Sequence, residues 1–365
     1  MGQVSRKLKK YILGIALGIA LMCGKESYAQ YNREYFFWVG RSCMMNNDYQ
    51  EAIRTLNTLL RFDEDAFEGY FLRGIAKYNL DDLLGAEQDF SYAIENNPVF
   101  TAAYQYRAIT RSRLGNYDDA LKDFQVAIDL RPDRPDPYFS RGVTFLLSQQ
   151  FEKAVEDFTT FIRFDNKVVD AYLNRGTSYL MMKDTTRAYE DYNTAIRTNR
   201  ESPLAYSRRG MLYMAQKKYD EALADFDKSI ECDSTYIPSY FNRALVYSTI
   251  NRPVQAIEDF SRVLALDSTS SLTYFNRAIL RNQIGDYNNA LADYDKVAFY
   301  SPNSITTARR CTGNWATTMP RSTTIRGRSS FIPISPTPIL AALHCVTCST
   351  TCRDPAATRR RPTRK

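Results

Sequence analysis

Residues 237–270 read IPSYFNRALVYSTINRPVQAIEDFSRVLALDSTS, and residues 271–304 read SLTYFNRAILRNQIGDYNNALADYDKVAFYSPNS. The two segments align without a gap. Each has Tyr-Phe-Asn-Arg-Ala near its start, and each has a second Ala sixteen residues after that Tyr, followed by Asp and an aromatic residue. A sequence that repeats itself at a fixed period of this length predicts a stacked array of identical units rather than one globular core.

The period of 34 residues extends back to Arg33 and gives eight units, in which we number the positions 1 to 34. Position 20 is Ala in all eight units, position 8 is Gly or Ala, position 4 is aromatic, and position 24 is aromatic in all but the first unit. A small and an aromatic residue four positions apart share one face of a helix. We therefore expect two short antiparallel helices per unit, with the small residues where the backbones approach.

The turn between the two helices is marked by Gly115 and Gly285, and three of the units close with Pro. In these offsets the chain resembles the tetratricopeptide repeat (TPR) family. The resemblance implies an all-α fold, a right-handed α-solenoid of about eight 34-residue helix-turn-helix repeats over residues 30–304. Stacking is required because one hairpin cannot bury its apolar face alone. Such a resemblance is specific for the fold and says little about function.

The charge is distributed unevenly along the chain. The net charge is +7, but residues 1–30 carry five basic and one acidic residue, and residues 303–365 carry eleven basic and one acidic residue. Residues 31–302 are therefore acidic, with a net charge of −7. The high pI of the whole chain is thus no argument for nucleic-acid binding by the repeats, and we expect none.

Residues 1–29 have the features of a secretory signal peptide. Basic residues precede the apolar run from Tyr11 to Cys23, and Ser27 and Ala29 are the small residues expected three and one positions before a cut. As a helix this run spans roughly 20 Å, which is short of the ~30 Å hydrocarbon core and argues against a membrane anchor. A lipoprotein would need acylation of Cys23, and the Met before it is too large for that motif. We expect cleavage near Ala29 and a periplasmic or cell-envelope location.

A pair of opposite charges recurs in the last seven units. Position 7 is Arg and position 23 is Asp in each of them, whereas the first unit has Val39 and Thr55. Because the two residues occur together and are missing together, we expect them to pair within one unit as an internal ion-pair ladder. The alternative is a basic stripe that binds acidic ligands. The ladder comprises Arg73, Asp89, Arg107, Asp123, Arg141, Asp157, Arg175, Asp191, Arg209, Asp225, Arg243, Asp259, Arg277 and Asp293.

The family resemblance implies that positions 2, 5, 9 and 12 of the first helix line the concave face. Position 5 is mostly aromatic or aliphatic, which suits an extended or helical apolar peptide, unless these side chains are buried between neighbouring first helices. Position 6 holds three Asn, similar to the Asn ladder with which some TPR superhelices bind a peptide backbone, unless these are ordinary solvated residues. The candidate partner-binding residues are Phe37, Phe71, Phe139, Leu173, Asn174, Phe241, Asn242, Phe275 and Asn276.

Residues 305–365 break the pattern. From 303 onward there is no Tyr and only one acidic residue, with thirteen Thr and ten Arg. His344, Cys345, Cys348 and Cys352 are spaced like zinc ligands, and the Arg-rich end resembles a polyanion-binding arm. We favour a third interpretation, an out-of-frame tail, in which each true codon starts at the third base of the codon read here. Thr then supplies the AC of Tyr, His, Asn or Asp codons, and Arg usually supplies the CG of Ala, Ser, Pro or Thr codons.

With permitted codons, the stretch from Asn314 through Phe331 and onward can conceal Leu-Gly-Asp-Tyr-His-Ala-Ala-Leu-Asp-Asp-Tyr-Thr-Arg-Ala-Ile-Glu-Leu-Tyr-Pro-Asp-Phe-Ala-Asn-Ala-Tyr. This is a further repeat with the right internal spacing, which arrives three to four residues early. We therefore expect an aberrant, disordered tail over 305–365 and no metal site.

The composition argues against catalysis. The single His lies in the tail, which removes a His-ligated metal site or a Ser/His apparatus from the repeats, and no stretch outside the repeats is long enough for an active site. We expect a non-enzymatic protein-protein interaction scaffold that binds a protein or peptide, with no cofactor, no nucleic acid and no small-molecule substrate. The other interpretation is a self-assembling structural subunit of an envelope complex, so a homo-oligomer stays open.

Overall fold

The computed structural model describes residues 33–300, which fall into two compact units that we treat separately, residues 33–164 and 165–300. Within these residues every regular element is a helix. The first unit contains a helical stretch over 33–45, then α2 (Tyr49–Phe62), α3 (Phe67–Asn79), α4 (Leu83–Asn96), α5 (Thr101–Arg113), α6 (Tyr117–Leu130), α7 (Asp136–Leu147) and α8 (Phe151–Phe164). The second contains α9 (Val169–Met181), α10 (Thr185–Thr198), α11 (Pro203–Ala215), α12 (Tyr219–Cys232), α13 (Ile237–Thr249), α14 (Pro253–Leu266), α15 (Ser271–Gln283) and α16 (Tyr287–Tyr300).

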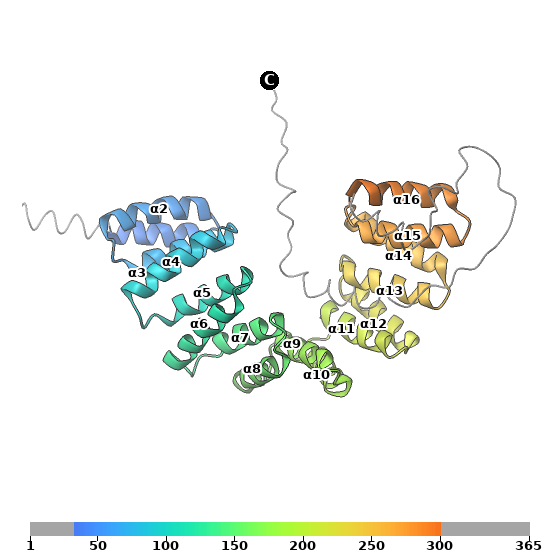
Figure 1. Cartoon of the computed structure of the whole chain (residues 1–365), viewed down its shortest axis with the longest axis horizontal. Coiled ribbons are helices and arrows are strands. Elements are labelled where there is room, and N and C mark those ends of the chain that lie inside the picture. The colour runs from blue at the N-terminus through green and yellow to red at the C-terminus, as the bar shows by residue number, and fades with distance from the viewer. Residues whose placement is uncertain (1–32, 301–365) are drawn as a thin grey trace, which may run out of the picture. The chain divides into compact units, whose positions relative to one another are not determined.

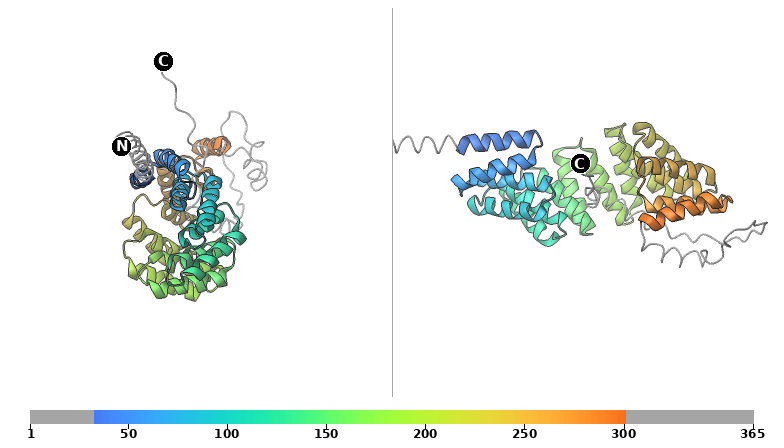
Figure 2. Two further views of the ribbon diagram at one scale, coloured as in Figure 1. Left: turned by 90° about the vertical axis from the view of Figure 1, so that its left-hand side faces the viewer. Right: turned by 90° about the horizontal axis from the view of Figure 1, so that it is seen from above.

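Each repeat forms one hairpin of two helices, as can be followed in Figure 1. α3 packs on α4, α5 on α6, α11 on α12, and so on through each unit. Each second helix also packs on the first helix of the next repeat in its unit, such as α4 on α5 and α12 on α13, which Figure 2 shows from two further sides. The all-α repeat fold predicted from the sequence is confirmed.

The core of each hairpin is built from the repeat positions that the sequence singled out. The Ala at position 20 is almost fully buried in all eight repeats, and the six aromatic side chains at position 24 from Phe90 to Phe260 are buried as well. The small residue at position 8 gives these rings their space, because a Cβ on Gly74 would lie 2.6 Å from the ring of Phe90. In each hairpin the small residue at position 8 thus lets the two helices approach closely, and the side chain at position 24 fills the space beside it.

The turn inside each hairpin has one conformation in all eight repeats. Position 15 has a positive φ throughout, +84° at Gly115 and Gly285 and between 59° and 65° at the six other residues. Glycine adopts this region without strain, whereas Lys183 and Lys217 adopt it at a cost. In several repeats an Asp at position 16 then starts the second helix, as Asp82 does by accepting a hydrogen bond from the Gly85 N–H at 3.1 Å. The turn glycines in the sequence therefore marked two members of a set of eight.

The expected signal peptide over 1–29 and the expected aberrant tail over 305–365 lie outside the described residues. Among the helices of residues 33–300, none has the length and apolar character that a membrane crossing demands.

Candidate partner-binding face

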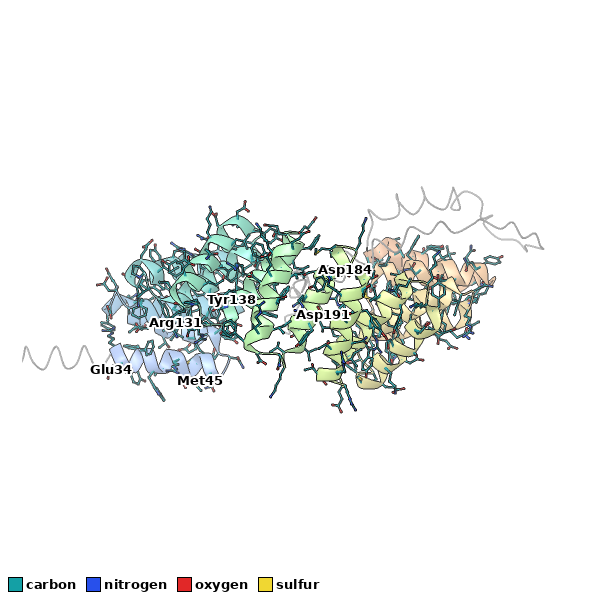
Figure 3. The ribbon with its side chains drawn as sticks, turned by 90° about the horizontal axis from the view of Figure 1, so that it is seen from below. Glu34, Met45, Arg131, Tyr138, Asp184 and Asp191 are labelled. Carbon is teal, nitrogen blue, oxygen red and sulfur yellow. The ribbon has the colours of Figure 1, made fainter. Side chains whose placement is uncertain are left out.

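The recurring Arg and Asp meet inside each repeat. In all seven repeats the guanidinium donates two hydrogen bonds to the carboxylate, from Nε to Oδ2 at 2.8–2.9 Å and from Nη2 to Oδ1 at 2.6–2.8 Å. The Arg comes from the first helix of the hairpin and the Asp from the second. Asp191, on α10, is one of the carboxylates labelled in Figure 3. This forked geometry is the strongest arrangement available to the pair.

The same Arg also bonds to the preceding repeat. Its Nη1 donates to the polar side chain at position 25, at 2.6 Å from Arg73 to Asn57 and at 2.7 Å from Arg141 to Gln125. Arg107, Arg209, Arg243 and Arg277 make the equivalent bond. This link was not predicted from the sequence, although position 25 carries a hydrogen-bonding side chain in every repeat and could have indicated it.

An aromatic ring lies under each of these guanidinium groups. The Arg carbon Cζ is 5.4–5.9 Å from the ring centroid of the Tyr at position 4, and Tyr138 of this set is labelled in Figure 3. The Arg side chains are only 13–20% exposed. A guanidinium held by a carboxylate and a ring at this burial offers little surface to an acidic ligand, so the geometry favours the ladder over the basic stripe.

The repeats differ in how many cations hold the Asp. Lys77, Arg111 and Arg281, at position 11, add a second cation at 2.7–2.8 Å from Asp89, Asp123 and Asp293. In repeats four to seven position 11 is aromatic. In three of these repeats burial raises the pKa of the Asp at position 23 despite the Arg beside it, and these residues are Asp157, Asp191 and Asp259.

The predicted partner-binding residues do not form one exposed stripe. Leu173 and Asn242 are only 3% exposed and belong to the packing between helices, so the expectation that they contact a partner is wrong for this conformation. The aromatic residues at position 5 are half-buried because they pack on the ring at position 24 of their own repeat. Their centroid distances are 5.9 Å for Phe71–Phe90, 5.8 Å for Phe139–Phe158, 5.5 Å for Phe241–Phe260 and 6.2 Å for Phe275–Tyr294.

The other candidates keep part of their surface in solvent. Phe37, Asn174 and Asn276 are half-buried. The amide of Asn276 donates to the carbonyl oxygen of Leu272 at 3.0 Å and is thereby partly committed to its own helix. The Asn residues at position 6 are therefore not equivalent, since one is buried and one is bonded locally.

The first helices nevertheless form a continuous face from α3 to α7 in the first unit and from α9 to α13 in the second. α3 contacts α5 and α5 contacts α7 in the first unit, and α9 contacts α11 and α11 contacts α13 in the second. Aliphatic side chains at position 9 lie half-buried along this face, among them Ile75, Ile109, Leu245 and Ile279. Leu272, at position 2 of α15, is 48% exposed. We call this surface the first-helix face.

Residues 33–300 hold no group of three or more His, Cys, Asp or Glu side chains arranged to bind a metal. The zinc-like spacing in the tail lies outside the described residues. A hollow of about 350 Å³ is lined by turn residues such as Gly115 and Gln149, and one of about 300 Å³ by α4 residues such as Glu87 and Tyr92.

Comparison with known families identifies the repeats. Tetratricopeptide repeat profiles match residues 32–104, 107–167, 170–202, 203–236 and 237–270. No curated protein matches the sequence significantly.

Three solved structures illustrate the likeness in fold. A tetratricopeptide repeat protein from Parabacteroides merdae is 20% identical with a TM-score of 0.54, and the match covers 67% of this chain and 96% of that one. The C-terminal part of a TPR protein from Cytophaga hutchinsonii is 21% identical with a TM-score of 0.52, covering 66% and 98%. Yeast Tom70 is 18% identical with a TM-score of 0.57, covering 72% of this chain and 57% of Tom70. At these identities the likeness concerns the fold alone.

Proposed function

Because the chain belongs to the tetratricopeptide repeat family, we propose that it is a non-enzymatic scaffold that binds a protein or peptide on its first-helix face. The observation that carries the proposal is the continuity of that face from α3 to α7 and from α9 to α13. These neighbouring first helices contact each other, and the face carries half-buried aliphatic side chains in a row. A row of apolar groups spaced by the helix repeat suits an extended chain or an amphipathic helix of a partner.

We place this scaffold in the cell envelope after export. The support is the basic, apolar and small-residue succession up to Ala29, which is the pattern of a cleaved secretory signal. N-terminal sequencing of the protein recovered from the periplasm is expected to begin at Gln30. A mature protein that begins at Met1 and stays in the cytoplasm would contradict the location.

The binding face can be tested with one exposed residue and a matched control. Leu272 lies on first helix α15, and Val254, which is 57% exposed, lies on second helix α14 of the preceding repeat. Both side chains are exposed, so a change to Asp in either leaves the hairpin core intact. We expect Leu272→Asp to lose a partner that the unchanged protein captures from envelope extracts, and Val254→Asp to retain it.

Circular dichroism melts of both variants serve as the folding control. Retention of the partner by Leu272→Asp, or its loss from both variants alike, would argue against the first-helix face as the binding surface.

A further inference from the structure

Among residues 33–300, nothing covers the outer side of α16, which is an apolar surface. In the earlier repeats, the second helix turns positions 17 and 21 toward the next repeat. Leu223 and Tyr219 of α12 are partly buried there and pack against a cluster that includes Val246 of α13. The equivalent residues of α16 are Leu291, 49% exposed, and Tyr287, 52% exposed. A terminal repeat of a solenoid normally ends in a polar outer face, and this one has the residues of an internal junction.

A polar group on the same helix is also left unused. Position 25 of each earlier repeat within a unit accepts a bond from the Arg at position 7 of the next one, as Asp227 does from Arg243. In α16 this position is Asp295, which is exposed and has no ion pair within residues 33–300. The helix thus presents both halves of a repeat junction, the apolar patch and the acceptor for an Arg.

We propose that this surface is the docking face for a ninth helical hairpin, and that the gene encodes this hairpin from residue 305 onward in the adjacent reading frame. In that frame every codon starts at the third base of the codon read here. The proposal concerns the architecture of the array and stands apart from its binding function.

At the turn, two adjacent residues of the shifted sequence are fixed without any choice of codon. Trp has the single codon TGG, and the Asn314 codon before it ends in T or C, so the shifted codon is TTG or CTG, which is Leu. The final G of the Trp codon and the GC of Ala316 then give GGC, which is Gly. Leu-Gly occupies positions 14 and 15 in Leu114-Gly115, where the turn has its positive φ. The shifted frame therefore places a glycine where the turn favours one.

The spacing on the N-terminal side of this glycine also fits. The codons of residues 304–309 permit Tyr-Tyr-Asn-Arg-Ala in the shifted frame, beside Tyr-Phe-Asn-Arg-Ala in both repeats seven and eight. The permitted Tyr precedes the fixed Gly by eleven residues, as Tyr274 precedes Gly285. The permitted Arg falls at position 7 of the new repeat, about four residues closer to Asp295 than the sixteen that separate position 25 from the next Arg in the earlier junctions, so the connection after α16 is shorter by that number. On the C-terminal side, the same register permits Ala at position 20, Asp at 23, Tyr at 24, Ala at 27 and Pro at 32.

The first test is the nucleotide sequence. The adjacent frame is expected to be open from codon 305 to at least codon 333 and to encode Arg at position 7 and Asp at position 23 of the new repeat. A stop codon in that stretch, or other residues at those two positions, overturns the proposal.

The second test compares the full chain as it stands with the full chain in the restored frame. In the restored chain, we expect amide hydrogen exchange of α16 to slow by about tenfold or more, because its outer side becomes covered. Leu291→Asp and Asp295→Ala are expected to lower the urea midpoint of the restored chain and to leave that of the present chain nearly unchanged. Leu223→Asp, the internal equivalent, should lower both midpoints.

An unprotected α16 in the restored chain, or a Leu291→Asp effect that is equal in the two chains, overturns the proposal. Light scattering tests whether a second copy of the chain occupies the surface instead. A concentration-dependent mass of the present chain that Leu291→Asp abolishes would assign the surface to a second copy and would also overturn it.

Discussion

Removal of one Arg from the ladder is expected to cost very different amounts in neighbouring repeats of the first unit. Arg141 holds Asp157 through Nε at 2.8 Å and Nη2 at 2.7 Å, and it is the only cation paired with that carboxylate within residues 33–300. Arg107 holds Asp123 with equivalent bonds, but Arg111 also contacts Asp123, at 2.8 Å. The two sites are matched in burial, since both Asp side chains are 7% exposed.

Arg141→Leu leaves Asp157 buried without a cation, for which losses of about 3–5 kcal/mol are typical. Arg107→Leu removes the same kind of fork but leaves Asp123 paired with Arg111, so we expect a loss smaller by about 2 kcal/mol. Both variants also lose one ring contact at position 4 and one bond to the preceding repeat, and these contributions largely cancel in the comparison. Arg141→Leu loses in addition the contact with the ring of Phe145 at 5.7 Å, which adds to its larger loss. With a urea slope of about 1–3 kcal/mol/M, the two midpoints should differ by roughly 1 M.

The pH dependence gives an independent check on this reasoning. Burial already raises the pKa of Asp157, and loss of Arg141 raises it further. A raised pKa in the folded state means that the folded protein binds the proton more tightly than the unfolded chain, so stability falls as pH rises from about 4 through the folded pKa. The penalty of Arg141→Leu should therefore be complete at pH 7 and shrink toward pH 4. Asp157→Asn in the same chain should recover part of it at pH 7.

The measurement is a urea titration followed by circular dichroism at pH 7 and pH 4.5. Equal midpoints for Arg141→Leu and Arg107→Leu, or a penalty that is constant with pH, would refute the account of a buried carboxylate held by one cation. Arg175→Leu, which removes the fork on Asp191, is expected to behave like Arg141→Leu because burial also raises the pKa of Asp191.

Three further predictions concern the turn, the hairpin core and a tyrosine pair. Lys217→Gly should stabilise by a few tenths to about 1 kcal/mol because Lys217 has φ +60°, whereas Lys218→Gly, at φ −87°, should bring no gain in the same urea titration. Gly176→Val should lower the free energy of unfolding by about 1–3 kcal/mol, and with it the melting midpoint, because a Cβ there lies 2.7 Å from the Tyr192 ring, and Gly176→Ala should cost less. Burial and the bond to the Tyr189 hydroxyl raise the pKa of Tyr213 to about 12, so NMR titration of labelled Tyr should find a lower pKa for Tyr213 in Tyr189→Phe; an unchanged value would exclude the bond as a cause.

The fold could be predicted from the sequence because its determinants are local and recur eight times. Ala52 and its seven equivalents allow the two helices of each hairpin to approach closely, and the aromatic residues at position 24 fill the space between them. Because the same pattern occurs in every repeat, the fold is predicted independently by each one. The turn was harder to see, because only two of its eight residues with positive φ are Gly; Asn and Asp at three others are a weaker signal, and Gln149, Lys183 and Lys217 carry none. Residue propensity identifies a turn position with positive φ only where the sequence has a residue, such as Gly, that adopts it without strain.

The candidate face was less accessible to sequence reasoning, because exposure depends on what a neighbouring repeat contributes. Phe71 and Phe241 have the spacing of a binding stripe, but each packs on a ring of its own repeat. Asn242 and Asn276 occupy the same repeat position, yet one is buried and the other is bonded to its own helix. Asn242 and Asn276 share the repeat position and the residue type, so only the packed structure distinguishes their surroundings.

The ladder also explains why the first repeat departs from the others. An Arg at position 7 is partly buried and satisfies its guanidinium in two directions, toward the Asp of its own hairpin and toward position 25 of the preceding repeat. No described repeat precedes the first one, so an Arg there would lack the second acceptor. Val39 and Thr55 need neither partner, and Asn57 of the same repeat still serves the Arg of the next one. An Arg at position 7 of this repeat would have no position-25 acceptor within residues 33–300, and a buried guanidinium with unused donors would destabilise the hairpin.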